Sequence, residues 1–173
     1  MMRIGPLVLV GLPASGKTRV GTLLATRLGW SFIDTDRVVE SQWGQSIPDI
    51  VELRGWDAFR RLEAAALADA VSRKDVVVAT GGGIVEDASN RHLLKRTTVI
   101  WLRAGHGVLL ARLAADRAAR PLLEGLPDER LADLARRRDP LYAELAGHEV
   151  ATDHLSTEGA AEAIMRVLNA ENG

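Results

Sequence analysis

The chain has 173 residues, of which 47% are hydrophobic and 26% are charged, and its formal net charge at pH 7 is −1. This composition is typical of a folded domain with its own core, and it argues against disorder and against a general polyanion-binding surface. Cysteine is absent, which excludes disulfides, thiolate nucleophiles and thiolate metal sites.

No stretch approaches the ~20 consecutive apolar residues that span a bilayer. The apolar run near the N-terminus is interrupted by Pro6, Gly11 and Pro13, which argues against a secretory signal. We therefore expect a cytoplasmic protein with neither a membrane nor nucleic acid as partner. Several arginines cluster between Arg112 and Arg138, so a local anion site is compatible with the near-neutral chain.

The first predicted strand, residues 7–10 ("LVLV"), leads into a glycine-rich loop and then into a segment, 18–28, whose apolar residues have the spacing of an amphipathic helix. The loop fits the phosphate-binding pattern G-x-x-x-x-G-K-S/T through Gly11, Gly16, Lys17 and Thr18. Backbone N–H groups and the helix N-terminus would face the phosphates, Lys17 would reach the β- and γ-phosphates, and Thr18 would ligate Mg²⁺. The pattern predicts a nucleotide site at 11–18; the alternative is a glycine-rich turn with an incidental lysine.

The second predicted strand, 31–34, ends in the sequence "FIDTD". In an extended chain Asp34 and Asp36, two residues apart, place their carboxylates on the same face. One could serve the hydration shell of a metal while the other meets a substrate hydroxyl, as phosphoryl transfer requires. The alternative is that these aspartates cap the following helix.

Two helices are predicted next. Ser46 followed by Pro48 and Asp49 is a helix start signal, and Gly55 is a stop signal. The helix over 57–73 carries "FRRLE", in which Arg60 and Glu63 share one face. The alternative for this pair is a solvated surface ion pair.

The strand predicted over 76–80 ends in Gly81, Gly82 and Gly83. Three consecutive glycines cost backbone entropy, which indicates a close approach by a ligand or by another part of the chain, with a plain tight turn as the alternative. Strands are also predicted over 98–102 and, more weakly, 148–152. The alternation of apolar strands with helices indicates an α/β fold, a parallel sheet with helices on both faces.

Six motifs together resemble the shikimate kinases: the phosphate loop, "DTD", "FRRLE", "GGG", "RPLL" (120–123) and "RDPLY" (138–142), in this order and spacing. The resemblance extends from residue 7 to about residue 152. It implies a five-stranded parallel sheet in the order 2-3-1-4-5, as in nucleoside monophosphate kinases. It also implies a single P-loop kinase domain over 1–173, with a substrate-binding region at about 36–63 and a mobile lid at about 114–128.

The implied reaction is ATP-dependent phosphorylation of the 3-hydroxyl of shikimate, a step of aromatic amino-acid (chorismate) biosynthesis. Mg²⁺ is the implied cofactor, shikimate and ATP are the implied small-molecule partners, and we expect a monomer.

On the acceptor side, the resemblance implies that Asp36 binds the shikimate hydroxyls and accepts or orients the 3-hydroxyl proton. Arg60 and Arg138 would grip the carboxylate with paired hydrogen bonds, and Glu63 would orient Arg60. Gly82, flanked by Gly81 and Gly83, would offer its backbone N–H.

On the nucleotide side, Asp34 would hold the Mg²⁺ shell together with Thr18. Arg120 would be a lid arginine that stabilises the transferring charge, and Pro121 would cover the substrate and exclude water. Arg117 is a second candidate for phosphate contact. The predicted ATP-binding residues are Gly11, Ala14, Ser15, Gly16, Lys17, Thr18, Arg19, Arg117 and Arg120.

Three positions depart from the family's usual pattern: Ala14 replaces a loop glycine, Thr18-Arg19 replaces Ser-Thr, and Trp56 replaces a glutamate. None of these changes removes a group that the mechanism needs. Two alternative functions are another small P-loop kinase acting on a hydroxy acid, such as a gluconate kinase, and a catalytically silent nucleotide-binding module. A silent module would be expected to lack at least one of the four residues assigned to the reaction, yet the sequence contains all of them: Lys17, Asp34, Asp36 and Arg120.

Overall fold

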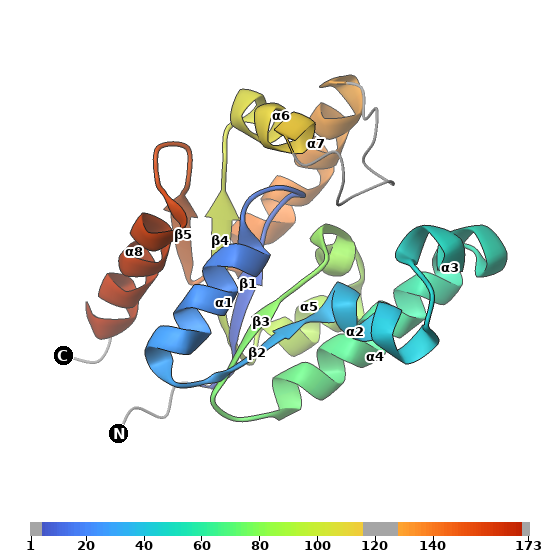
Figure 1. The fold of residues 1–173 in the computed structure, drawn as a ribbon, viewed down its shortest axis with the longest axis horizontal. Coiled ribbons are helices and arrows are strands. Elements are labelled where there is room, and N and C mark those ends of the chain that lie inside the picture. The colour runs from blue at the N-terminus through green and yellow to red at the C-terminus, as the bar shows by residue number, and fades with distance from the viewer. Residues whose placement is uncertain (1–4, 116–127, 171–173) are drawn as a thin grey trace.

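Five parallel strands form one sheet in the order β2-β3-β1-β4-β5 in the computed structural model, which describes residues 5–115 and 128–170 (Figure 1). The strands are β1 (Leu7–Val10), β2 (Ser31–Asp34), β3 (Val76–Ala79), β4 (Thr98–Arg103) and β5 (His148–Ala151). The predicted fold class and strand order are confirmed. Each strand begins at the predicted residue, and the last three end within one residue of the predicted position.

The central strand β1 is buried on both faces of the sheet. Its four residues are all 0% exposed. Val8 and Val10 belong to the apolar cluster on one face, and Leu7 and Leu9 belong to the cluster on the other. This division follows from the two-residue period of a strand, and a sheet covered on both faces requires the continuous apolar run that the sequence contains.

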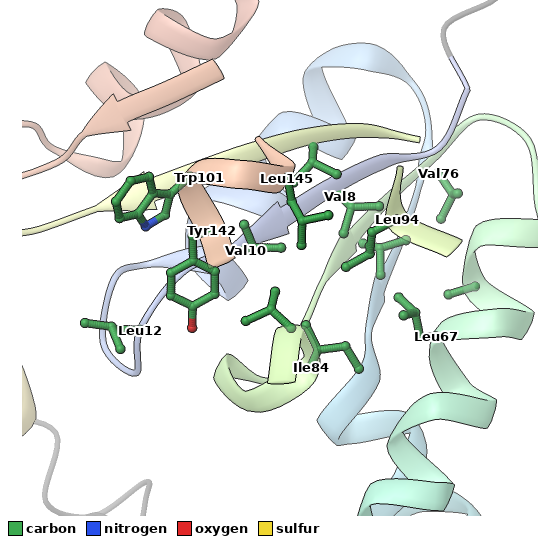
Figure 2. Close-up of a cluster of buried hydrophobic side chains, with 14 of the residues drawn as sticks. Val8, Val10, Leu12, Leu67, Val76, Ile84, Leu94, Trp101, Tyr142 and Leu145 are labelled. Carbon is green, nitrogen blue, oxygen red and sulfur yellow. The ribbon is translucent and has the colours of Figure 1, made fainter. Parts of the chain in front are cut away.

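Helices cover the two faces of the sheet. They are α1 (Lys17–Leu28), α2 (Thr35–Trp43), α3 (Ile47–Arg54), α4 (Trp56–Ser72), α5 (Ala88–Leu94), α6 (His106–Ala115), α7 (Asp128–Leu145) and α8 (Thr157–Ala170). Helices α1 and α8 pack on the Leu7 face, whereas α4, α5, α6 and α7 contribute to the Val8 face (Figures 1 and 2). None of these described helices has the length and apolar character needed to cross a membrane.

Helices α2, α3 and α4 form a smaller apolar cluster beside the sheet around Val39, Ile50 and Phe59. The predicted boundaries of α3 are confirmed. Ser46 caps its N-terminus by accepting the Asp49 N–H, and Gly55 ends it with a φ of 80°.

The carboxyl ends of three neighbouring strands lie at one edge of the sheet. In the parallel register, Ala79 of β3 pairs with Leu9 of β1 on one side and with Asp34 of β2 on the other. The phosphate-loop motif, the "DTD" motif and the glycine run each follow one of these strands, so all three emerge at this edge. Ligands of open α/β sheets bind at this position.

Shortening one side chain of β1 tests whether this strand lies at the centre of the core. We expect Leu9→Ala to lower the free energy of unfolding by about 3 kcal/mol, because it removes buried methyl groups and leaves a cavity. Leu53, which is 67% exposed, provides the matched control, and Leu53→Ala is expected to cost less than about 0.5 kcal/mol. Urea unfolding followed by circular dichroism measures both. Equal costs for the two variants would contradict the assigned core.

Candidate active site

The loop between β1 and α1 has the tight conformation expected of a phosphate-binding loop. Gly11 and Gly16 have φ angles of 148° and 99°, and Ala14 has a φ of 63°. A side chain on Gly11 would also collide with the backbone oxygen of Leu102 on β4. The loop therefore needs glycine at both ends, and Ala14 occupies a backbone region that glycine adopts at lower cost.

Lys17 lies at the first position of α1 with a largely buried side chain. Its ammonium donates to the carbonyl oxygens of Gly11 at 2.8 Å and Leu12 at 2.9 Å, and lies 3.4 Å from Ser15 Oγ. These contacts hold the ammonium inside the loop, beside the N–H groups that begin the helix. Arg19, also predicted to bind ATP, lies two residues further along α1 and is exposed.

Thr18 and Asp34 are in direct contact. The Thr18 hydroxyl donates to Asp34 Oδ2 at 2.7 Å. Asp34 Oδ1 accepts the backbone N–H groups of Asp36 and Arg37 and so caps α2. The structure brings together the two residues predicted to serve a metal, one from the first turn of α1 and the other from the end of β2.

The expectation of an extended "DTD" segment is wrong. The strand ends at Asp34, and Asp36 already belongs to the first turn of α2. The caps that Asp34 makes start the helix at once, so the two carboxylates differ in role instead of sharing one face of a strand. The Asp36 carboxylate instead lies beside Gly81, where a methyl group would come within 2.8 Å of its Oδ1.

Each glycine of the run after β3 has a different neighbour. A methyl group on Gly81 would overlap Glu63 Oε1, and one on Gly83 would overlap the Arg60 guanidinium. At Gly82 a methyl group would lie 3.1 Å from Arg138 Nη1 and 3.3 Å from Pro13 Cδ. The close approach predicted for "GGG" is confirmed, and Gly82 lies between Arg138 and the phosphate loop.

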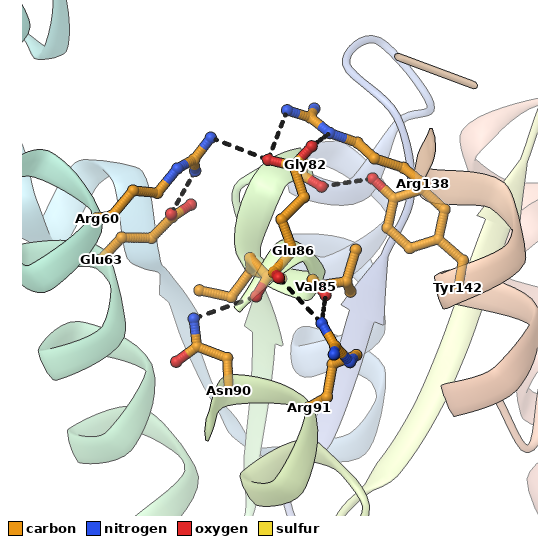
Figure 3. Close-up of polar contacts among 10 residues, drawn as sticks. Arg60, Glu63, Gly82, Val85, Glu86, Asn90, Arg91, Arg138 and Tyr142 are labelled. Carbon is orange, nitrogen blue, oxygen red and sulfur yellow. Dashed lines mark hydrogen bonds and ion pairs between the residues drawn. The ribbon is translucent and has the colours of Figure 1, made fainter. Parts of the chain in front are cut away.

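Arg60 and Arg138 come from α4 and α7, and a single carboxylate contacts both (Figure 3). Arg60 Nη1 lies 2.6 Å from Glu63 Oε2, and Glu63 is only 1% exposed, which rules out a solvated surface pair. Arg138 Nε donates to Glu86 Oε1 at 3.1 Å, and Arg60 Nη2 lies 3.6 Å from Glu86 Oε2.

The two carboxylates have opposite electrostatic environments. Burial raises the pKa of Glu63 above its ordinary value, and the charge of Arg60 opposes only part of that shift. Partial burial would also raise the pKa of Glu86. However, the hydrogen bond from Arg138 and the charges of both arginines outweigh it, so this pKa lies below its ordinary value.

Three residues organise this region through contacts that the sequence motifs did not predict. Glu86 ends the short 3-10 helix η1 (Gly82–Glu86), the buried Tyr142 hydroxyl donates to the Gly82 carbonyl at 2.5 Å, and Arg112 of α6 contacts Ala14 O and Thr152. Tyr142 is the last residue of "RDPLY", and Glu86 follows shortly after the glycine run, so their places beside these motifs could have marked them as candidates. Their partners are distant in sequence, so pattern alone could not pair them.

Comparison with known proteins identifies the family. Residues 13–169 match the sequence model of the family described as shikimate kinase. The chain belongs to the shikimate kinase family. A shikimate kinase of Nitratidesulfovibrio vulgaris is 50% identical over 150 residues, which cover 84% of this chain and 85% of the relative. That of Symbiobacterium thermophilum is 46% identical over 166 residues, with coverage of 94% and 95%.

A solved structure, shikimate kinase from Acinetobacter baumannii in complex with shikimate, is similar to this one with a TM-score of 0.91. The two chains are 38% identical, and the match covers 97% of this chain and 94% of the other. A gluconokinase from Sinorhizobium meliloti 1021 has a TM-score of 0.61 at 20% identity, which shows a shared fold only.

These findings confirm the predicted family and enzyme class, and membership of the shikimate kinase family implies the use of ATP. Most of the predicted lid, with Arg117, Arg120 and Pro121, lies outside the described residues, so the roles of these three remain predictions. Only its outer limits are described: α6 ends at Ala115, and α7 begins at Asp128.

Ala14 provides a test of the loop conformation. We expect Ala14→Gly to raise the free energy of unfolding by roughly 0.5–1 kcal/mol, because glycine relieves the positive φ at a smaller cost in chain entropy. The same substitution at Ala68, exposed on α4, should lower it by about 1 kcal/mol. Urea unfolding measures both, and destabilisation by both variants would contradict the loop conformation.

Proposed function

We propose that this chain transfers the γ-phosphate of ATP to the 3-hydroxyl of shikimate. One observation carries the proposal: Gly82 lies close both to Pro13 of the phosphate loop and to the Arg138 guanidinium, since a methyl group on it would be 3.3 Å from Pro13 Cδ and 3.1 Å from Arg138 Nη1. A small acid bound by the arginines would therefore lie next to the nucleotide phosphates, and proximity of the two reactants is the main requirement of phosphoryl transfer.

On the nucleotide side, the loop from Gly11 to Thr18 supplies the phosphate contacts. Backbone N–H groups of Ala14, Ser15 and Gly16 and the N-terminus of α1 would face the phosphates. Lys17 would exchange its hydrogen bonds with the Gly11 and Leu12 carbonyls for the β- and γ-phosphate oxygens. Holding the ammonium within the loop beforehand reduces the reorganisation needed when ATP binds.

The contact of Thr18 with Asp34 fits a magnesium ion. Mg²⁺ prefers oxygen ligands and keeps several waters, so one hydroxyl and one nearby carboxylate are a suitable protein contribution. Among the described residues there is no cluster of three or more His, Cys, Asp or Glu side chains that could hold a metal alone. We assign Thr18 as a direct ligand and Asp34 to the hydration shell. When bound, the ion would neutralise charge on the β- and γ-phosphates.

On the acceptor side, Asp36 would accept or orient the proton of the attacking hydroxyl. Arg60 and Arg138 would bind the carboxylate of shikimate, for which their planar guanidinium groups offer paired donors. Buried Glu63 holds Arg60 from behind at 2.6 Å. Gly82 would present its backbone N–H, while the Gly81 N–H is already donated to Thr35 Oγ1. Tyr142 holds the next peptide unit through the Gly82 carbonyl.

The proposal extends to features that the described residues leave untested. On the resemblance of "RPLL" alone, Arg120 stabilises the transferring charge and Pro121 covers the substrate. Arg117, which precedes this motif, is a second candidate for phosphate contact. Residues 1–173 form one kinase domain, with the phosphate loop at 11–18, the substrate-binding region at about 36–63 and the lid at about 114–128. We propose a cytoplasmic protein, since ATP is available in the cytoplasm, and a monomer, since the described residues of a single chain supply groups for both the nucleotide and the acid.

ADP release from ATP and Mg²⁺ tests the function directly. The assay compares shikimate, gluconate, AMP and no acceptor, each with and without EDTA. We expect strong stimulation by shikimate alone, abolished by EDTA. Stimulation by gluconate or AMP in place of shikimate would overturn the proposed acceptor, and no stimulation by any acceptor would favour a silent nucleotide-binding module.

Substitution of Asp36 tests its role. We expect Asp36→Asn to lower kcat by about 10²–10⁴-fold, because the amide cannot accept the hydroxyl proton. Its Kd for ATP, measured by calorimetry, should stay within about twofold. Asp69→Asn removes a carboxylate from an exposed ion pair with Arg73 and serves as the control with unchanged kcat. Near-normal turnover by the Asp36 variant would remove this residue from the mechanism.

A further inference from the structure

Glu86 occupies a position that the proposed reaction does not require. Its carboxylate lies between the guanidinium groups of Arg60 and Arg138 (Figure 3). Oε1 accepts from Arg138 Nε at 3.1 Å, and Oε2 lies 3.5 Å from Arg138 Nη2 and 3.6 Å from Arg60 Nη2. An acid of the substrate would approach the same two guanidinium groups, so Glu86 already provides them with a carboxylate.

The donors used by Glu86 are the ones that bind carboxylates best. Nε and Nη2 form one of the paired edges of a guanidinium, and Glu86 faces this edge of Arg138 with both oxygens. On Arg60, Glu63 takes Nη1 and Glu86 lies next to Nη2. A substrate carboxylate that needs either edge must share it with Glu86 or displace it.

The charges of the cluster also cancel. Two guanidinium groups face the two carboxylates of Glu63 and Glu86, which leaves no net charge among the four side chains. Without Glu86 the cluster would carry one positive charge, which matches a monocarboxylate. One additional negative charge at hydrogen-bond distance weakens the attraction for an incoming anion.

Glu86 is not needed to hold Arg60 in place, because Glu63, at 2.6 Å and buried, already fixes that side chain. The Arg138 side chain is only 9% exposed, so removal of the Glu86 charge would leave its buried guanidinium with donors for an incoming carboxylate. The Glu86 side chain is 31% exposed and its distance to Arg60 is longer, so its carboxylate can turn away towards solvent at a small cost.

We propose that Glu86 is a specificity-determining residue whose carboxylate competes with the acid group of the acceptor for Arg60 and Arg138. This inference rests on the proposed function. Glu86 keeps the paired donors occupied until a substrate displaces it, and it lowers the affinity of the site for carboxylates. Only an acid that gains further contacts from its hydroxyl groups then binds well.

The test is Glu86→Gln, which keeps the shape and one acceptor oxygen but removes the charge. We expect KM for shikimate to fall by roughly two- to fivefold, the order expected for one partly exposed charge pair. KM for ATP should stay within about twofold. Glu144→Gln, which removes an exposed carboxylate paired with Lys95 away from this cluster, is the matched control and should leave KM for shikimate unchanged.

A neutral competitor separates charge from shape. The methyl ester of shikimate lacks the negative charge, so its inhibition constant against shikimate should be the same in the parent protein and the Glu86 variant. An unchanged or higher KM for shikimate in the variant would overturn the inference. A fall in the inhibition constant of the ester as large as the fall in KM for shikimate would also overturn it. Failure of the proposed function is a different result, since it would leave the parent protein without any response to shikimate.

Discussion

The burial of β1 and β3 on both faces of the sheet is the constraint on which the site depends. Two strands with no exposed face can connect to the surface only at their ends, and their parallel register brings the carboxyl ends together. The phosphate loop and the glycine run are therefore forced into contact, with Gly82 against Pro13 and the Gly11 carbonyl. Side chains at Gly81 and Gly83 would close the space that Asp36, Glu63 and Arg60 occupy.

Electrostatic balance is the second principle of this site. Glu63 pairs with Arg60, whereas Glu86 contacts both Arg60 and Arg138; the two carboxylates differ in burial, and their pKa values shift in opposite directions. Glu63 is a buried support whose desolvation is tolerated because Arg60 is so close. Glu86 is more exposed, ionised and able to move away. In the proposed acid site, Glu63 would be a permanent counterion and Glu86 an exchangeable one, and the affinity for the acid would depend on that exchange.

Much of the site could be predicted from short motifs because each motif is a local solution to a chemical problem. The phosphate loop needs glycines, a lysine and a helix start within eight residues, and these stand together in the sequence. The conformation of the "DTD" segment was harder to predict, since its residues are compatible with both a strand and the start of a helix. The hydrogen bonds from Asp36 and Arg37 to Asp34 decided for a helix, and they are visible only in the fold.

The amino-acid sequence by itself determined the alternation of strands and helices, the nucleotide loop and the kinds of group available for chemistry. Periodicity and local motifs carry that information because they depend on residues close together in the chain. Only the tertiary structure decided that Glu86 lies between Arg60 and Arg138, that Tyr142 holds the Gly82 carbonyl and that Arg112 joins Ala14 to Thr152. These pairs are separated by 26 to 98 residues, and which partners meet depends on how α4, α6 and α7 pack around the sheet.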